Sequence, residues 1–139
     1  KADKYCQETG DTSSQLKQWP VQLHLVNPNA QYYHGADVLL AADCSAYSAG
    51  GFHQDYLKDK ALAIACPKLD TEKQVYADKI VKWIDESKIN TLTVLTMEVP
   101  CCSGLLSMAV DAREKANRNI PIKHVTLSIQ GEKLTEEWV

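Results

Sequence analysis

Long hydrophobic runs, clustered positive charge and glycine-rich phosphate loops are all missing from this sequence of 139 residues. No apolar stretch approaches the ~20 residues that a membrane-spanning helix needs. The net charge is −3 and the sequence pI is about 5.8. A chain with this charge and no basic patch lacks the electrostatic footprint of a protein that binds nucleic acid or anionic lipid. We therefore expect neither nucleic acid nor a membrane among its partners.

The motifs of several common activities are also absent. The six glycines form neither G-x-G-x-x-G nor G-x-x-x-x-G-K-[ST], so nucleotide binding has no support in the sequence. The five cysteines contain no C-x-x-C pair, which disfavours thioredoxin-like exchange, and no C-x2-C-x2-C-x3-C run, which excludes a bacterial ferredoxin cluster within these residues. G-x-S-x-G and H-E-x-x-H are missing too. The chemistry must come from residues that are separated in the sequence.

The composition is typical of one small domain with a polar extension. A chain of this length with 45% hydrophobic residues can bury a single core. Residues 1–20 are polar and are predicted to be an arm or linker, and residues 21–139 are predicted to form the domain. An odd number of cysteines, most of them directly after apolar segments, is unlike a secreted disulfide framework. We therefore expect a reducing, cytoplasmic setting.

Strand and helix patterns alternate from residue 21 onward. Strands are predicted at residues 21–26, 37–42, 61–65, 91–99 and 122–129. A short helix is predicted at residues 52–57. A second helix is predicted after a capping box formed by Thr71 and Gln74, and a third over residues 105–117. Helical spacing gives the second a core-facing stripe of Tyr76, Ile80, Trp83 and Ile84, and the third one of Leu105, Ala109, Ala112 and Ala116. This alternation predicts an α/β fold, a single three-layer domain in which helices cover both faces of a mostly parallel sheet of about five strands. Such an arrangement is Rossmann-like or flavodoxin-like.

Cysteines follow three of the predicted strands. Cys44 comes after 37–42, Cys66 after 61–65, and the adjacent pair Cys101-Cys102 after 91–99. Ligands of open parallel sheets bind beyond the carboxyl ends of the strands, so these thiols converge if the three strands are neighbours. His53 follows a flexible Ser-Ala-Gly-Gly stretch and is expected to fold back over the same edge. Thiols with an imidazole match zinc or an iron–sulfur centre better than calcium or magnesium.

The neighbouring residues refine this metal hypothesis. Adjacent side chains diverge, so one of Cys101 and Cys102 is expected to be a ligand and the other to lie in the core. Asp43 and Glu98 are candidates to orient the ligands through hydrogen bonds, with simple strand-end polarity as the alternative. Free cysteine also serves as a small apolar filler, which is the alternative for each thiol.

Four segments of the chain resemble a known group of sequences. They are Gln15-Leu16-Lys17-Gln18-Trp19-Pro20-Val21-Gln22-Leu23, Leu40-Ala41-Ala42-Asp43-Cys44, Ile64-Ala65-Cys66-Pro67-Lys68-Leu69-Asp70 and Glu98-Val99-Pro100-Cys101-Cys102-Ser103-Gly104. Together they resemble the cysteine-containing C-terminal region of ferredoxin-type (4Fe–4S) iron–sulfur proteins of anaerobic bacteria and archaea. The resemblance implies a cytoplasmic protein linked to redox or metal chemistry, with a ferredoxin-type module upstream. It supplies no activity for this region itself.

Three hypotheses about function follow. The first is a metal-binding domain of a redox or electron-transfer accessory protein, with zinc or an iron–sulfur cluster held at the strand ends. The second is a thiol redox enzyme or switch without metal, in which Cys101 or Cys102 is the nucleophile and Cys44 or Cys66 the resolving thiol. The third is a module that docks on an upstream ferredoxin domain or a redox partner protein, with its cysteines only buried. Cys6, in the polar arm, has no part in any of them.

Overall fold

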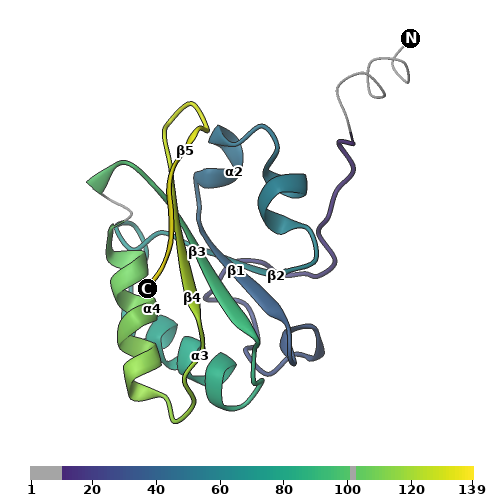
Figure 1. Ribbon diagram of the computed structural model, residues 1–139. Coiled ribbons are helices and arrows are strands. Elements are labelled where there is room, and N and C mark those ends of the chain that lie inside the picture. The colour runs from purple at the N-terminus through teal and green to yellow at the C-terminus, as the bar shows by residue number, and fades with distance from the viewer. Residues whose placement is uncertain (1–10, 101–102) are drawn as a thin grey trace.

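A single five-stranded sheet with the order β2-β1-β3-β4-β5 runs through the molecule (Figure 1). The computed structural model describes residues 11–100 and 103–139. The strands are β1 (Asp37–Ala42), β2 (Ala61–Ala65), β3 (Thr91–Met97), β4 (Ile122–Leu127) and β5 (Lys133–Trp138). The first four are parallel, and β5 pairs antiparallel with β4. The chain moves in one direction from β1 to β2 and in the other from β2 to β3, so the order reverses between β1 and β3.

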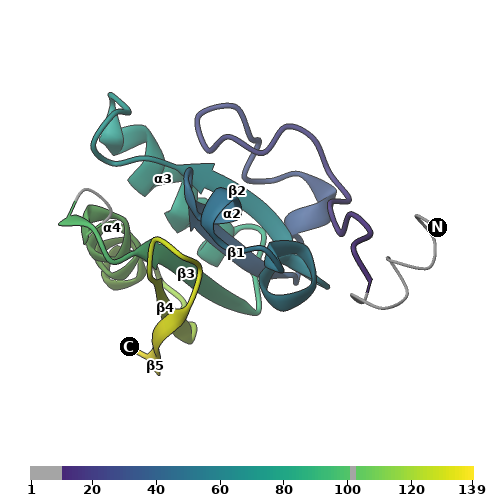
Figure 2. The same ribbon diagram turned by 90° about the horizontal axis from the view of Figure 1, so that it is seen from above.

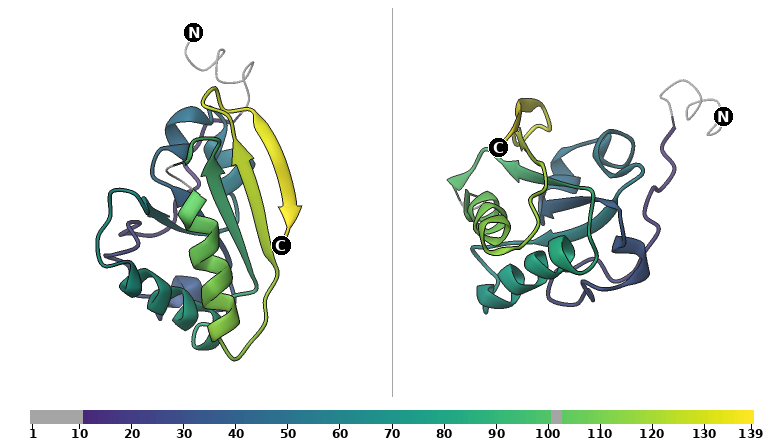
Figure 3. Two further views of the ribbon diagram at one scale, coloured as in Figure 1. Left: turned by 90° about the vertical axis from the view of Figure 1, so that its left-hand side faces the viewer. Right: turned by 60° about the horizontal axis from the view of Figure 1, so that its bottom comes forward.

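Helices cover both faces of this sheet. The helical elements are the 3-10 helix η1 (Gln31–Tyr33), α2 (Ser45–Ser48), the π-helix η2 (His53–Leu57), α3 (Lys73–Asp85) and α4 (Ser103–Lys115). The two long helices, α3 and α4, pack against each other on one face, while α2 and η2 lie on the other (Figure 3). The predicted α/β fold with a mostly parallel sheet is thereby confirmed. No helix among the described residues has the length and apolarity to cross a bilayer.

The core lies where the predicted apolar stripes meet. Burial on both faces accounts for the unbroken apolar composition of β1, in which every residue after Asp37 is buried. Helix α3 turns one apolar stripe toward the sheet, consisting of Tyr76, Ile80, Trp83 and Ile84, all fully buried. Leu105, Ala109 and Ala112 do the same for α4.

One of the strand predictions is wrong, and one strand of the sheet was not predicted. Residues 21–26 do not form a strand; only Gln22 makes an isolated parallel bridge, to Ile64. The segment forms turns instead, because the N–H groups of Leu25 and Val26 both donate to the Gln22 carbonyl. The Lys79 ammonium holds this turn by donating to three of its carbonyls, at 2.7 to 2.9 Å. The fifth strand is β5, which was not predicted because Lys-Leu-Thr-Glu-Glu-Trp lacks an alternating pattern. All six of its residues are exposed, and pairing with β4 gives it its conformation.

Two local predictions concern helix starts. The capping box of Thr71 and Gln74 does not form: α3 is preceded by Glu72, which has a φ of 56° and no capping hydrogen bond. The Gln74 amide instead donates to Asp78 one turn along the helix, at 3.0 Å. The short helix predicted at 52–57 is present as η2, with π-helical geometry.

The described part of the polar arm, residues 11–20, runs past the outer edge of β2, on the side of the sheet away from β5 (Figure 2). The side-chain amide of Gln18 accepts a hydrogen bond from the Leu62 N–H and donates one to the Leu62 carbonyl, both at 2.8 Å. Gln18 therefore pairs with β2 much as a neighbouring strand would. The arm reaches the domain surface before residue 21, where the domain was predicted to begin.

Candidate functional site

The sheet order places side by side the three strands that precede the predicted site cysteines. Strand β1 lies between β2 and β3, so Cys44 and Cys66 follow neighbouring strands at the same edge. The Asp43 N–H donates to the Ala65 carbonyl at 3.1 Å, which continues the β1–β2 ladder one residue beyond β1. Cys101 and Cys102 follow β3 in the sequence and lie outside the described residues.

Neither described cysteine behaves as a buried filler. Cys44 is exposed, and Cys66 is half-buried; both are free thiols. The turn after β1 accounts for the exposure of Cys44, because it is the next residue, Ser45, that is buried and donates from its hydroxyl to the Ala42 carbonyl at 2.8 Å. The hypothesis that the cysteines are only buried therefore does not fit Cys44.

A hydrogen-bonded carboxylate holds the loop that carries Cys66. The Asp70 Oδ2 atom accepts hydrogen bonds from the Cys66 N–H (2.9 Å), the Tyr76 hydroxyl and the Gln22 side chain (3.2 Å). Burial opposes ionisation of this carboxyl, but the three donors together hold the pKa of Asp70 below its ordinary value. The ring of His24 packs 4.2 Å from that of Tyr76. Asp70 is therefore an ionised group fixed beside Cys66.

Asp43 and Glu98, the two carboxylates predicted to orient the ligands, differ in their surroundings. One carboxylate oxygen of Asp43 is buried and has no hydrogen-bond partner among the described residues. Burial raises the pKa of Asp43, and the nearby negative charge of Asp70 raises it further. Glu98 is exposed, and its carboxylate accepts a hydrogen bond from the Ile129 N–H at 2.9 Å. Glu98 thus holds the loop after β4, as a strand-end polar residue does.

His53 faces the polar arm. Its Nδ1 atom accepts a hydrogen bond from the Gln15 N–H at 3.0 Å, and its side chain lines a hollow of about 600 Å³ together with Asp11 and Thr12. Across residues 11–100 and 103–139, no three His, Cys, Asp or Glu side chains form a group that could hold a metal ion. Cys44, Cys66 and His53 are therefore not brought together as three ligands. A ligand set that includes Cys101 or Cys102 stays a prediction.

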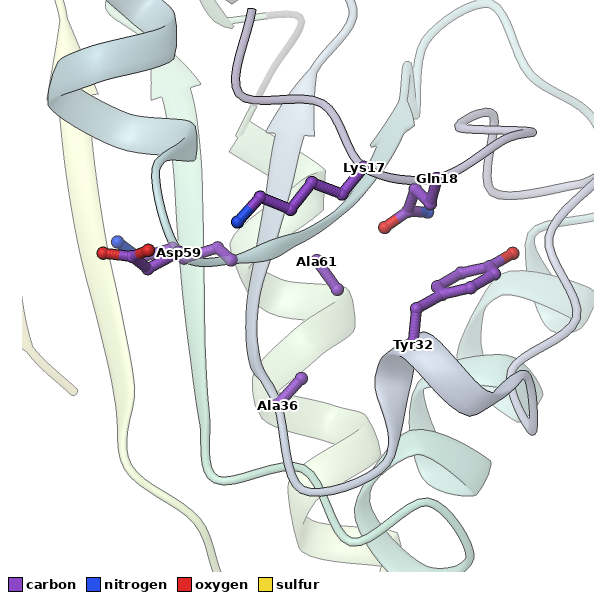
Figure 4. Close-up of a pocket in the computed structure, with 7 residues that line it drawn as sticks. Lys17, Gln18, Tyr32, Ala36, Asp59 and Ala61 are labelled. Carbon is purple, nitrogen blue, oxygen red and sulfur yellow. The ribbon is translucent and has the colours of Figure 1, made fainter.

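A second hollow lies at the opposite, amino edge of β1 and β2 (Figure 4). It has a volume of about 330 Å³ and is lined by Lys17, Gln18, Tyr32, Ala36, Asp59, Lys60 and Ala61. The side chain of Lys17 extends across its mouth from the arm (Figure 4). None of these residues was singled out as a candidate from the sequence. Because it opens at the other edge of the sheet, this hollow is separate from the thiols.

Sequence reasoning missed the group formed by Asp70, Tyr76 and Gln22. Tyr76 was assigned to the core by its helical spacing, and it is fully buried, but its hydroxyl is also a hydrogen-bond donor to Asp70. The available signal was the spacing in Cys-Pro-Lys-Leu-Asp, because an aspartate at the end of so short a loop can bond back to the loop's own backbone.

Comparison with known proteins agrees with this architecture. An uncharacterized protein of Archaeoglobus fulgidus is 32% identical over 117 residues, which cover 84% of this chain and 81% of the relative. No solved structure matches the chain. The resemblance to ferredoxin-type iron–sulfur proteins therefore stays a prediction. The family model described as "Rossmann-like domain" matches residues 30–139, from η1 to the C-terminal residue, and the chain belongs to this family.

Proposed function

We propose that this chain is a metal-binding domain of a redox or electron-transfer accessory protein. Zinc or an iron–sulfur centre would be held by Cys44, Cys66 and one of Cys101 and Cys102. The observation that carries the proposal is the sheet order β2-β1-β3, in which the strand before Cys44 lies directly between the strands before Cys66 and before Cys101-Cys102. Neighbouring strands lie ~4.8 Å apart, so residues just beyond their carboxyl ends are within reach of one metal centre.

The position of the cysteines in the fold also supports a ligand site at the carboxyl ends of β2, β1 and β3. In an open α/β sheet, ligands bind beyond the carboxyl ends of the strands, at the point where the strand order reverses. Here the order reverses between β1 and β3, the strands that lead to Cys44 and to Cys101-Cys102. The thiols therefore follow the strands at which this fold class binds its ligands.

The charges beside Cys66 favour a cation. Asp70 is ionised and accepts a hydrogen bond from the Cys66 N–H, and its negative charge acts on the nearby Asp43 carboxyl. Neither carboxylate takes part in an ion pair within the described part of the chain. Activated cysteine nucleophiles, by contrast, sit beside positive charge. The metal hypothesis therefore accounts for these carboxylates better than the hypothesis of a metal-free thiol enzyme does.

A metal would give the domain one of two roles. Zinc would tie the three strand ends together, and an iron–sulfur centre would carry electrons to or from a ferredoxin-type domain or another redox partner. A metal-free thiol switch is a second candidate, favoured by the exposure of Cys44, because an accessible free thiol can take part in disulfide exchange.

Metal analysis of protein purified without oxygen tests the proposal. We expect close to one equivalent of zinc, or the iron and sulfide of one cluster, and loss of more than about half of it in Cys44→Ser and in Cys66→Ser. Cys6→Ser is the matched control and should leave the metal content unchanged. Less than about one tenth of an equivalent of zinc plus iron in the unaltered protein would contradict the proposal. A disulfide involving Cys44 in that same sample would favour the thiol switch instead.

A further inference from the structure

The loop from Cys66 to Asp70 is closed on itself by two hydrogen bonds. The Cys66 N–H donates to the Asp70 carboxylate at 2.9 Å, and the Asp70 N–H donates to the Cys66 carbonyl at 2.8 Å. The backbone of Cys66 is therefore fixed on both sides of its Cα atom. Because the Cβ direction follows from the backbone, this closure limits where the half-buried thiol can point.

The Asp70 carboxylate is in turn held from two other elements. The Tyr76 hydroxyl, fully buried on α3, donates to the same oxygen as the Cys66 N–H. The Gln22 side-chain amide reaches both members of this pair, at 3.2 Å to Asp70 and 3.1 Å to the Tyr76 hydroxyl. A carboxylate with three donors on one oxygen has little freedom to rotate, so the loop cannot open without breaking several bonds.

Gln22 brings the N-terminal segment into this network. Its own backbone is anchored on β2, because the Leu23 N–H donates to the Ile64 carbonyl at 2.9 Å and the Ile64 N–H donates to the Val21 carbonyl at 2.8 Å. One segment thus contacts the strand that leads to Cys66 and, through Gln22, the loop that follows it. A displacement of residues 21–23 would therefore change the position of the Cys66 loop through the Gln22 side chain.

We propose that Asp70 is the positioning residue of Cys66, and that Gln22 couples this position to the N-terminal segment of the chain. The inference rests on the proposed function in one respect, namely that Cys66 is a metal ligand whose direction matters. Asp70 itself does not touch the metal in this proposal. It holds the Cys66 loop in the conformation that presents the sulfur at the carboxyl edge.

The reactivity of Cys66 in metal-free protein provides the test. The chain of 139 residues is treated with a chelator and a reductant, alkylated with iodoacetamide, and analysed by peptide mass spectrometry, so that Cys66 and Cys44 are read separately in one sample. The measured quantity is the ratio of the Cys66 rate to the Cys44 rate. We expect Asp70→Ala to raise this ratio about fivefold, because the loop opens, and Gln22→Ala to raise it about twofold. In the double variant, Gln22→Ala should add nothing further.

Two controls separate position from charge and from general destabilisation. Asp70→Asn removes the charge but keeps an oxygen that can accept the Cys66 N–H, so its ratio should stay within about twofold of the unaltered protein. Asp85→Ala removes a carboxylate at the C-terminal end of α3 that also accepts backbone hydrogen bonds, from Asn117 and Arg118 at 2.9 to 3.0 Å. It should lower stability without changing the ratio.

Each result decides the inference without reference to the metal. An unchanged ratio in Asp70→Ala, or an equal rise in Asp70→Asn and Asp70→Ala, would overturn the positioning role, the second because charge alone would then explain the effect. A rise in Asp85→Ala would overturn it as well. If the ratio responds as expected but the purified protein holds no metal, the positioning of Cys66 stands and the proposed function fails.

Discussion

The two lateral edges of the sheet, at β2 and at β5, are held by different kinds of contact. On the outer side of β2, the backbone groups of Leu62 and Ile64 are satisfied by Gln18 and by the backbone of Val21 and Leu23. At the other end of the sheet, every residue of β5 is exposed, and its side chains are held by charge pairs such as Lys123 with Glu136 at 3.1 Å.

The hydrogen bonds to buried backbone therefore lie on β2, the strand that leads to Cys66. Loss of a hydrogen bond to a buried backbone group lowers the free energy of unfolding, because the remaining N–H or carbonyl group cannot bind water instead. Exposed ion pairs contribute little to that free energy. Strand β2 leads directly to Cys66, and the segment that covers it also supplies Gln22. The lateral edge at β2, one of the strands that lead to the candidate site, is therefore held by hydrogen bonds to buried backbone, whereas the lateral edge at β5 is held by exposed ion pairs.

Replacing Gln18 should have the largest effect on stability and is the strongest test of the contrast between the two lateral edges. In Gln18→Ala the N–H of Leu62, a buried residue, loses its acceptor, so we expect a loss of about 2 kcal/mol in the free energy of unfolding, measured by urea denaturation. Gln15→Ala is the control, because Gln15 binds His53 through its backbone N–H and not through its side chain. A loss below about 0.5 kcal/mol in Gln18→Ala would mean that the arm does not secure this edge.

The sequence predicted the parts of the fold that depend on burial and missed those that depend on single polar side chains. Strands β1 to β4 have apolar or alternating patterns typical of a buried sheet, and all four were located, although β3 and β4 each end two residues before the predicted limits of 99 and 129. Residues 21–26 have an alternating pattern too, but they form a turn that is held by the ammonium of Lys79, more than fifty residues away. Strand β5 has no pattern to detect, since neither of its faces is buried.

The same division holds for the candidate site. Convergence of Cys44 and Cys66 was predicted only on the condition that the strands before them are neighbours, and β1 and β2 are neighbours in the sheet. The role of Asp70 depends on a hydroxyl of α3 and an amide of the N-terminal segment meeting at one oxygen atom, which no local pattern encodes. His53 was expected over the thiols from the flexibility of the preceding glycines, but the Gln15 N–H holds its Nδ1 atom toward the arm.

A smaller effect should appear on the β5 side, through pH. His124 on β4 shares a hydrogen bond of 2.8 Å with the Thr96 hydroxyl, and burial lowers the pKa of His124 below its ordinary value despite the nearby Glu137. As the pH falls, His124 therefore gains its proton at a higher pH in the unfolded chain than in the folded one. The free energy of unfolding should accordingly decrease between about pH 7 and pH 5. We expect less than about 1 kcal/mol after solvent screening, measured by urea denaturation at both pH values. His124→Gln should flatten this difference, and an unchanged pH dependence in that variant would assign it to another group.

The smallest effect is expected at the exposed edge itself. Glu136 pairs with Lys123 at 3.1 Å and with Lys133 at 3.3 Å, and these two lysines hold the pKa of its carboxyl below the ordinary value. All three side chains are solvent-accessible, so Glu136→Gln should cost no more than about 0.5 kcal/mol, and that cost should vanish in high salt. Urea denaturation at low and at high salt measures both quantities. A salt-independent loss equal to that of Gln18→Ala would show that β5 is secured as firmly as β2, and the contrast between the two lateral edges of the sheet would then fail.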